Sequence, residues 1–216
     1  MPKSKHFEVH ILLDVTDTDI HFHPQKITNY LQQKLEVSTH EVSYTSANIY
    51  LGLINEFRHN PIHHKISLHP VNLAEDKTKI RKAQQQEFLK ELHHGILNLK
   101  KTPLSKLKTS MIVEPISDRL NTIRTSSDTN TIFLIFSDML HNKEDISFYS
   151  DDTEKLESFL NAKLKRDQNK PLHNTQIWCI YAPSSSKKDL LFQKSKELWQ
   201  QAISITGAKI HFKSNL

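Results

Sequence analysis

Oxygen-bearing side chains cluster at two points of the sequence, each directly after an apolar run. Asp14, Thr16 and Thr18 are spaced i, i+2, i+4, and Ser137 and Asp138 follow a second run. If the first loop curls, its carboxylate and two hydroxyls can face one point. Such hard oxygen ligands suit Mg²⁺ or Mn²⁺, which keep several waters and accept few carboxylates.

Six segments are expected to form the strands that position these side chains. Continuous apolar runs, rather than strict alternation, are typical of strands covered on both faces, as in a parallel sheet. The strong runs are 7–13, 47–54, 131–136 and 176–181, and weaker ones are 65–68 and 208–212. We expect 7–13 to be central and to neighbour 131–136. Both acidic loops would then lie at the carboxyl edge of the sheet, where ligands of such folds bind.

Helical periodicity fills the segments between the strands. It predicts helices that begin near Pro24 and that cover 79–100, 156–164 and 186–204, the last with Ser186 as its N-cap. The polar stretches 100–110 and 125–130 are expected to be loops. Alternating strands and helices predict an α/β fold, with a doubly wound, mostly parallel six-stranded sheet flanked by helices in a single domain, 1–216.

Low counts of two residue types exclude several functions. The three glycines are far apart, which excludes Gly-rich phosphate-binding loops, and the single Cys179 excludes an internal disulfide framework and thiolate zinc sites. The run Ile11–Leu13 is too short for a signal-peptide core, and no stretch reaches the roughly 18 apolar residues of a membrane span. We therefore expect a cytoplasmic protein with no membrane partner.

Basic and histidine-rich segments give weaker signals. The net charge of +5 is mild, and no aromatic residue interleaves the lysines of 100–108, so nucleic-acid binding is not predicted. Adjacent histidines on a helix point about 100° apart, so His93 and His94 cannot chelate one ion. Solvated histidines are the better interpretation, with only His21 and His23 close to the predicted metal site.

The loop after the first strand resembles a known signature. Asp14-Val15-Thr16-Asp17-Thr18 is similar to the Asp-x-Ser-x-Ser motif, in its Thr form, of the von Willebrand factor A (vWA) family. In that family the motif opens a metal-ion-dependent adhesion site, and Asp138 matches its third part. The middle part of that site is a Thr or Ser at the start of a helix, and it is matched by Ser110, which is then expected to open a helix, or, in a second alignment, by Glu114. We prefer Ser110, because it keeps a hydroxyl at the metal.

The resemblance implies a non-enzymatic binding module, similar to poorly characterised bacterial vWA-like proteins. Thr16, Thr18 and Ser110 would coordinate Mg²⁺ or Mn²⁺ directly, while Asp14 and Asp138 would hold its waters. An open coordination position would take a carboxylate from a partner protein, as a component of a larger bacterial assembly. The flexible Gly that follows the family's first motif is missing here.

Three other interpretations compete with this one. Asp14 fits the nucleophile of a haloacid-dehalogenase-like phosphatase, but Thr16 stands where that family's acid/base Asp belongs and cannot exchange a proton near neutral pH. A phosphoacceptor receiver domain needs an adjacent acidic pair, which Asp14 and Asp17 do not form. In the structural alternative, Asp14 and Asp138 only cap loops and helices.

Overall fold

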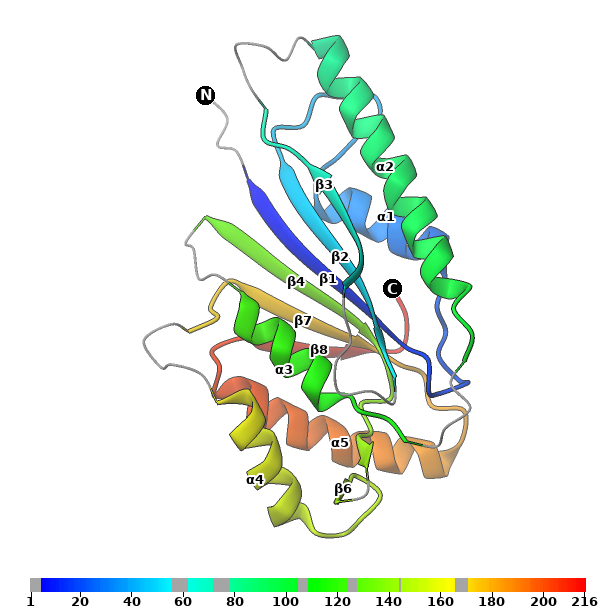
Figure 1. The fold of residues 1–216 in the computed structure, drawn as a ribbon, viewed down its shortest axis with the longest axis vertical. Helices are drawn as coiled ribbons and strands as arrows, with labels where there is room; N and C mark the ends of the chain where they lie inside the picture. Colours follow the sequence, from blue (N-terminus) through cyan, green and yellow to red (C-terminus); the bar gives the residue numbers. More distant parts are fainter. Residues whose placement is uncertain are drawn as a thin grey trace.

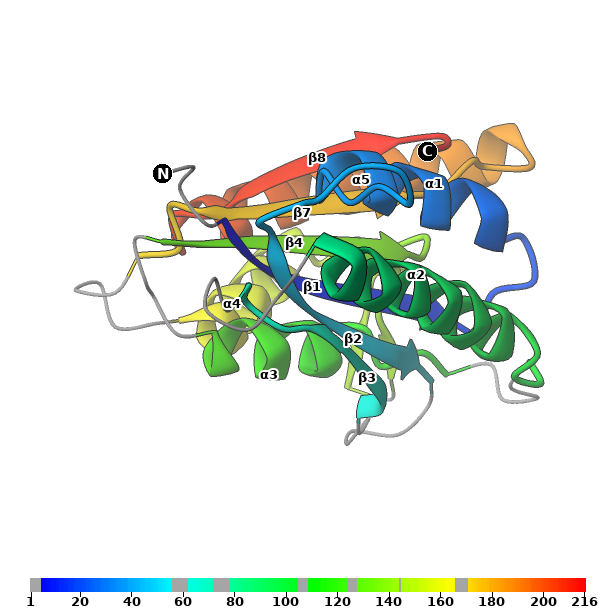
Figure 2. The ribbon, with the colours of Figure 1, turned by 90° about the horizontal axis from the view of Figure 1, so that it is seen from above.

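A six-stranded sheet forms the centre of the molecule, and its strands fan out from one edge to the other in Figure 2. The computed structural model describes residues 5–55, 62–71, 78–104, 109–123, 128–143, 145–165 and 171–216. The strands are β1 (His6–Asp14), β2 (Ser46–Ile54), β3 (Ile62–Leu68), β4 (Thr129–Phe136), β7 (Thr175–Ile180) and β8 (Lys209–Lys213). Their order across the sheet is β3-β2-β1-β4-β7-β8.

The pairing of the strands confirms the predicted mostly parallel sheet. Among the described strands of this sheet, the β2–β3 pair alone is antiparallel, and β1 is central and adjacent to β4, as the apolar runs indicate. From β1 the chain continues toward β3 on one side, and from β4 it continues toward β8 on the other. The change of direction lies between β1 and β4, which is where ligands bind in sheets of this kind.

Helices cover both faces of the sheet, so the fold is doubly wound (Figure 1). One face carries α1 (Pro24–Lys34) and α2 (Thr78–Lys100), and the other carries α3 (Val113–Thr122), α4 (Thr153–Leu164) and α5 (Ser186–Ser204). Among the described residues, no helix combines the length and the apolar character that crossing a membrane requires.

Each face of the sheet has its own hydrophobic core. In β1, Val9, Ile11 and Leu13 pack with the α1–α2 side, whereas Leu12 packs with the α3–α5 side. This alternation follows from the period of two in a strand, and a strand that is buried on both faces is apolar at most positions. The apolar run Ile11–Leu13 reflects the central place of β1, whereas the polar Glu8 and His10 of the same strand contact each other.

Several boundaries differ from those expected. The N-cap of α5 is Ser185, whose Oγ accepts a hydrogen bond from the backbone N of Lys188, so the expected N-cap Ser186 is the first helical residue. β4 begins at Thr129, which places the end of the expected 125–130 loop in a strand. Residues 105–108 and 125–127 of the two expected loops lie outside the described residues.

Two elements of the structure, the helix α3 and a short hairpin, are absent from the elements that the sequence pattern predicts. α3 begins at Val113, three residues beyond Ser110, and its N-cap Ile112 offers no side-chain hydrogen bond. A two-stranded hairpin, β5 (Asn142–Lys143) and β6 (Ile146–Ser147), follows β4. Ser110 therefore does not open a helix but lies in an extended segment that pairs with Asn142.

Candidate functional site

The parallel pairing of β1 and β4 brings the two acidic loops together. Leu13 is in register with Phe136, so the next residues, Asp14 and Ser137, are neighbours at the carboxyl edge. Ser137 Oγ donates a hydrogen bond of 2.8 Å to Asp14 Oδ2 and accepts one of 2.9 Å from the backbone N of Met139. The predicted convergence of the two loops is thus present in the structure.

Asp14 organises the first loop from a buried position. Its Oδ1 accepts hydrogen bonds from the backbone N and from Oγ1 of Thr16, at 2.8 and 2.6 Å. Asp14 is 1% exposed, and this burial raises the pKa of its carboxyl, although the hydrogen bonds from Thr16 and Ser137 oppose the shift. Because the Thr16 hydroxyl donates its hydrogen to Asp14, the lone pairs of its oxygen remain available to coordinate a cation.

Ser110 reaches the same edge from the segment that precedes α3. Its backbone N and O exchange hydrogen bonds with Asn142, and Met111 N donates to Asn55 O. Ser110 is 7% exposed, and its Oγ is buried without a hydrogen-bond partner among the described residues. A buried hydroxyl without a hydrogen-bond partner lowers stability, so a ligand, an ion or a water that contacts this oxygen would remove that cost.

Asp138 is held in the loop that leaves β4. Its Oδ1 accepts a 2.9 Å hydrogen bond from Leu140 N. Burial, followed by repulsion from Asp14, raises the pKa of the Asp138 carboxyl to about 8. Met139 has a left-handed φ of 60°, and its carbonyl accepts hydrogen bonds from Ser195 Oγ and Trp199 Nε1 on α5, which fix this loop.

A cavity of about 360 Å³ opens beside these groups. Oxygen-bearing side chains, two lysines and apolar side chains line it together: Thr16, Asp17, Ser110, Asp138, Leu140, Asn142, Tyr149, Ser185, Lys187, Lys188 and Leu191. It thus brings together three of the five predicted metal-site residues. Asp14 lies behind them as their hydrogen-bonding support, while Thr18 is exposed and lies outside the lining.

Glu114, the alternative for the middle position, has other neighbours. Its carboxylate lies 3.7 Å from His141 Nδ1 and 3.8 Å from Lys163 Nζ on α4. Burial lowers the pKa of the His141 imidazole, while the charge of Glu114 opposes that shift. Glu114 is absent from the cavity lining, so of the two alternatives only Ser110 lies at the cavity.

An ion-pair cluster beside the cavity escaped sequence reasoning. Lys188 Nζ lies 2.6 Å from Asp19 Oδ2 and 3.4 Å from Asp17 Oδ1, and Ser184 Oγ also donates to Asp19 Oδ2. The hydrogen bond to Asp19 raises the pKa of Lys188. The alternation of Asp with Thr in 14–19 could have pointed to Asp17 and Asp19, but nothing in the sequence links them to a lysine about 170 residues later.

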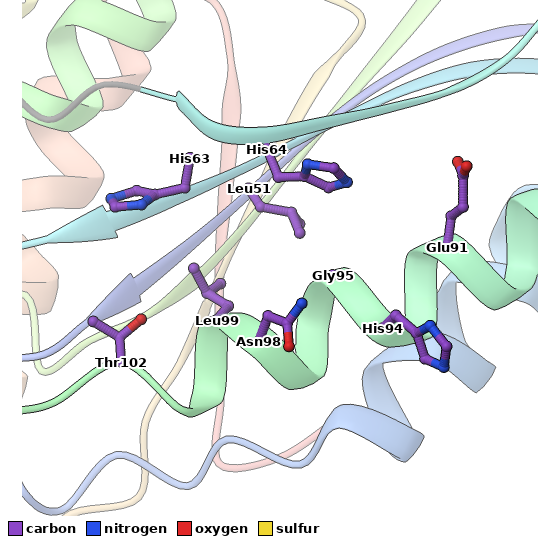
Figure 3. Close-up of a pocket in the computed structure, with 9 residues that line it drawn as sticks. All are labelled: Leu51, His63, His64, Glu91, His94, Gly95, Asn98, Leu99 and Thr102. Carbon is purple, nitrogen blue, oxygen red and sulfur yellow. The ribbon is translucent and has the colours of Figure 1, made fainter.

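The histidines form no metal centre within the described part of the chain. No group of three His, Cys, Asp or Glu side chains there could hold a metal ion. A second cavity, of about 480 Å³, lies between α2 and the β2–β3 edge and is lined by His63, His64 and His94 among others. Figure 3 shows that the rings of these three histidines point in different directions.

No protein-family model matches the sequence, and no curated protein matches it. The fold and the cavity therefore carry the functional argument. They define an α/β protein with an oxygen-lined cavity beyond the carboxyl ends of its two central strands, at the point where strand order reverses.

Proposed function

We propose that this chain is a non-enzymatic, vWA-like interaction module that binds a partner protein's carboxylate through a divalent metal. The observation that carries the proposal is the buried, unpartnered hydroxyl of Ser110, which lines one cavity with Thr16 and Asp138. Thr16 and Ser110 would bind the ion directly, and Asp14 and Asp138 would orient its waters. Thr18 belongs to this set only through the family resemblance.

The donor set fits Mg²⁺ or Mn²⁺. It consists of hydroxyl and carboxylate oxygens, whereas zinc prefers imidazole and thiolate. A divalent charge would also stabilise the carboxylate form of Asp138, whose pKa is now raised by burial and, to a smaller extent, by repulsion from Asp14. Because most of the direct ligands are neutral, we expect weak affinity for the metal alone and tighter binding when a partner carboxylate completes the shell.

The proposed partner is an acidic protein segment in a bacterial, cytoplasmic assembly. Lys187 and Lys188 line the cavity together with the carboxylates. Tyr149, which is 53% exposed, also lines it. An incoming carboxylate would therefore meet positive charge before it reached the metal. The single thiol, Cys179, is buried and free, which agrees with a reducing compartment.

The phosphatase alternative is disfavoured by the position of Asp14. A nucleophile must reach its substrate, but this carboxylate is 1% exposed and hydrogen bonds occupy both of its oxygens. Asp14 also lies outside the cavity lining. Turnover of a generic phosphate ester with Mg²⁺, abolished by Asp14→Asn, would contradict the binding-module proposal.

Metal binding by Ser110→Ala tests the site itself. We expect wild-type protein to bind Mn²⁺ weakly, measured by water-proton relaxation, and Ser110→Ala to lose most of that binding. Ser117→Ala is the matched control, because Ser117 is also buried but donates its hydroxyl to Glu114 O, away from the cavity. Equal Mn²⁺ binding by wild type and Ser110→Ala would contradict the proposed metal site.

Partner binding needs a second experiment. Proteins captured from a bacterial lysate with Mg²⁺ present should be released by a chelator, and Ser110→Ala should fail to capture them. An acidic residue of the captured protein, identified by crosslinking and changed to alanine, should abolish the complex. Capture that is unaffected by both the chelator and this change would contradict the proposal.

A further inference from the structure

Lys188 carries a positive charge into the cavity that the metal is proposed to occupy. Its side chain is 39% exposed, and its Nζ pairs with Asp19 and Asp17. Asp17 and Lys188 both line the cavity that contains Asp138. One wall of the candidate metal site is therefore a lysine ion pair.

The ammonium shares the cavity with the proposed metal-site residues. Lys188 lines it together with Thr16 and Asp138, so its charge supplies part of the positive charge that a bound cation would supply. Two cations in one cavity repel each other, and they do so more strongly where water is partly excluded.

The place of Lys188 in its helix gives it no other electrostatic support. It is the third residue of α5, and its backbone N donates to the N-cap Ser185. The N-terminal end of a helix carries partial positive charge, so a lysine there is disfavoured unless carboxylates hold it. Asp17 and Asp19 supply those carboxylates, so the orientation of this ammonium is built by the same loop that carries Thr16.

Resting on the proposed function, we propose that Lys188 is a tethered cation that competes with the divalent metal for this cavity. Lys188 thus sets the metal concentration at which the site fills. With the metal absent, the ammonium balances part of the carboxylate charge. A metal ion that enters the cavity is repelled by the ammonium of Lys188. The site therefore stays empty until the metal or a partner carboxylate is abundant.

Three variants of the full chain test this competition. Lys188→Met removes the ammonium but keeps an unbranched side chain, Lys188→Arg keeps the charge, and Lys187→Met removes a neighbouring charge. Lys187 lines the same cavity but is in none of the ion pairs found in the described part of the chain. Circular dichroism verifies that each variant folds.

Calorimetry with Mg²⁺ alone and water-proton relaxation with Mn²⁺ alone measure the metal Kd. We expect Lys188→Met to lower the Kd about tenfold or more, within the usual range of coupling between sites. Lys188→Arg should bind like wild type, and Lys187→Met should change the Kd clearly less than Lys188→Met. Binding by Lys188→Met that is no tighter than wild type, or no tighter than Lys187→Met, overturns the competition.

These outcomes separate the inference from the proposed function. Metal binding by wild type that Lys188→Met leaves unchanged overturns the competition and leaves the metal-dependent module intact. Tighter metal binding by Lys188→Met together with chelator-insensitive capture of partners supports the competition and overturns the interaction mechanism. Metal binding by none of the variants overturns both.

Discussion

Ser137 Oγ donates a 2.8 Å hydrogen bond to Asp14 Oδ2 and thereby ties the carboxyl end of β4 to that of β1. The two residues are 123 positions apart in the chain, and both are buried. The same oxygen of Ser137 accepts the Met139 backbone N–H, so one hydroxyl holds both loops of the candidate site.

Ser137→Ala should destabilise the fold. The change leaves one oxygen of a buried carboxylate and one buried backbone N–H without this partner, which costs about 1–3 kcal/mol. Urea denaturation with a chelator present measures the loss in the free energy of unfolding. Ser147→Ala is the control, because Ser147 Oγ accepts the Tyr149 N–H in the same way but at an exposed site, and it should change stability by less than about 0.5 kcal/mol. Equal effects of the two changes would contradict the role given to the Asp14–Ser137 bond.

In the absence of metal, Ser110→Ala should not destabilise the fold, in contrast to Ser137→Ala. The change removes a buried hydroxyl that has no hydrogen-bond partner among the described residues, so the free energy of unfolding should be unchanged or higher by up to about 1 kcal/mol. With millimolar Mg²⁺, wild type should gain stability and Ser110→Ala should not. Thermal unfolding with chelator and with Mg²⁺ measures both. A large loss of stability in chelator would show that the hydroxyl is structural.

Gly95→Ala should destabilise the packing of α2 on the sheet. A Cβ at this position would lie 2.8 Å from Leu51 Cδ1 and 3.0 Å from Ile66 Cδ1, so these core side chains would have to move. Figure 3 labels Gly95 and Leu51. Overpacking of this kind costs about 1–3 kcal/mol, which exceeds the helix-propensity gain of up to about 1 kcal/mol. Asn98→Ala, at an exposed position of the same helix, gains propensity without a clash and should be neutral or stabilising. Denaturant midpoints of the two variants test the difference, and a stabilised Gly95→Ala would contradict the close approach.

His10 makes a contribution to stability that should be lost as the pH drops below about 6.5. Its ring stacks on Phe133 and Tyr50 at centroid distances of 4.5 and 4.9 Å, and its Nε2 lies 2.8 Å from Glu8 Oε1. Burial lowers the pKa of the imidazole below its ordinary value of 6.5, although Glu8 opposes this shift. The unfolded chain therefore binds a proton that the folded state excludes, so this contribution is intact above pH 6.5 and is lost as the pH falls toward the folded pKa.

His10→Phe keeps a stacking ring and removes the proton. Below pH 6.5 it should reduce the slope of unfolding free energy against pH by up to about 1.4 kcal/mol per pH unit. The slope that remains combines the effect of His141, whose pKa burial also lowers, with the opposite effect of Asp14 and Asp138, whose pKa values burial raises. Tyr50→Phe, which leaves His10 in its stack, should keep the wild-type slope. An unchanged slope in His10→Phe would show that the folded state already accommodates the charged imidazole.

The sequence predicted the central sheet well because burial on both faces leaves a direct trace. β1 and β4 must be apolar at most positions. Their apolar runs therefore predicted both strands and placed them next to each other at the centre of the sheet. The place of Asp14 followed from the same pattern, because a polar residue that ends a buried strand has to lie at the sheet edge.

The parts that sequence reasoning missed depend on contacts between distant residues. The pairing of Lys188 with Asp17 and Asp19 leaves no periodic signal, because it joins a helix terminus to a loop far away in the chain. The segment around Ser110 is placed by backbone hydrogen bonds to Asn142, which any residue type can make. The N-cap of α5 was missed by one residue, because 184–186 is a run of three serines that composition cannot distinguish.

The adjacency of β1 and β4 also fixes when the site can form during synthesis. β1 is made before β4, its partner on one side, which begins only at Thr129, and the intervening chain must close as a long loop before the two strands pair. Contacts of such long sequence separation slow folding. On the ribosome, the newly made β1 must therefore wait, with only its β2 edge covered, until β4 has emerged. The carboxylate of Asp14 therefore gains its hydrogen bond from Ser137 only after the 123 positions that separate the two residues have been translated.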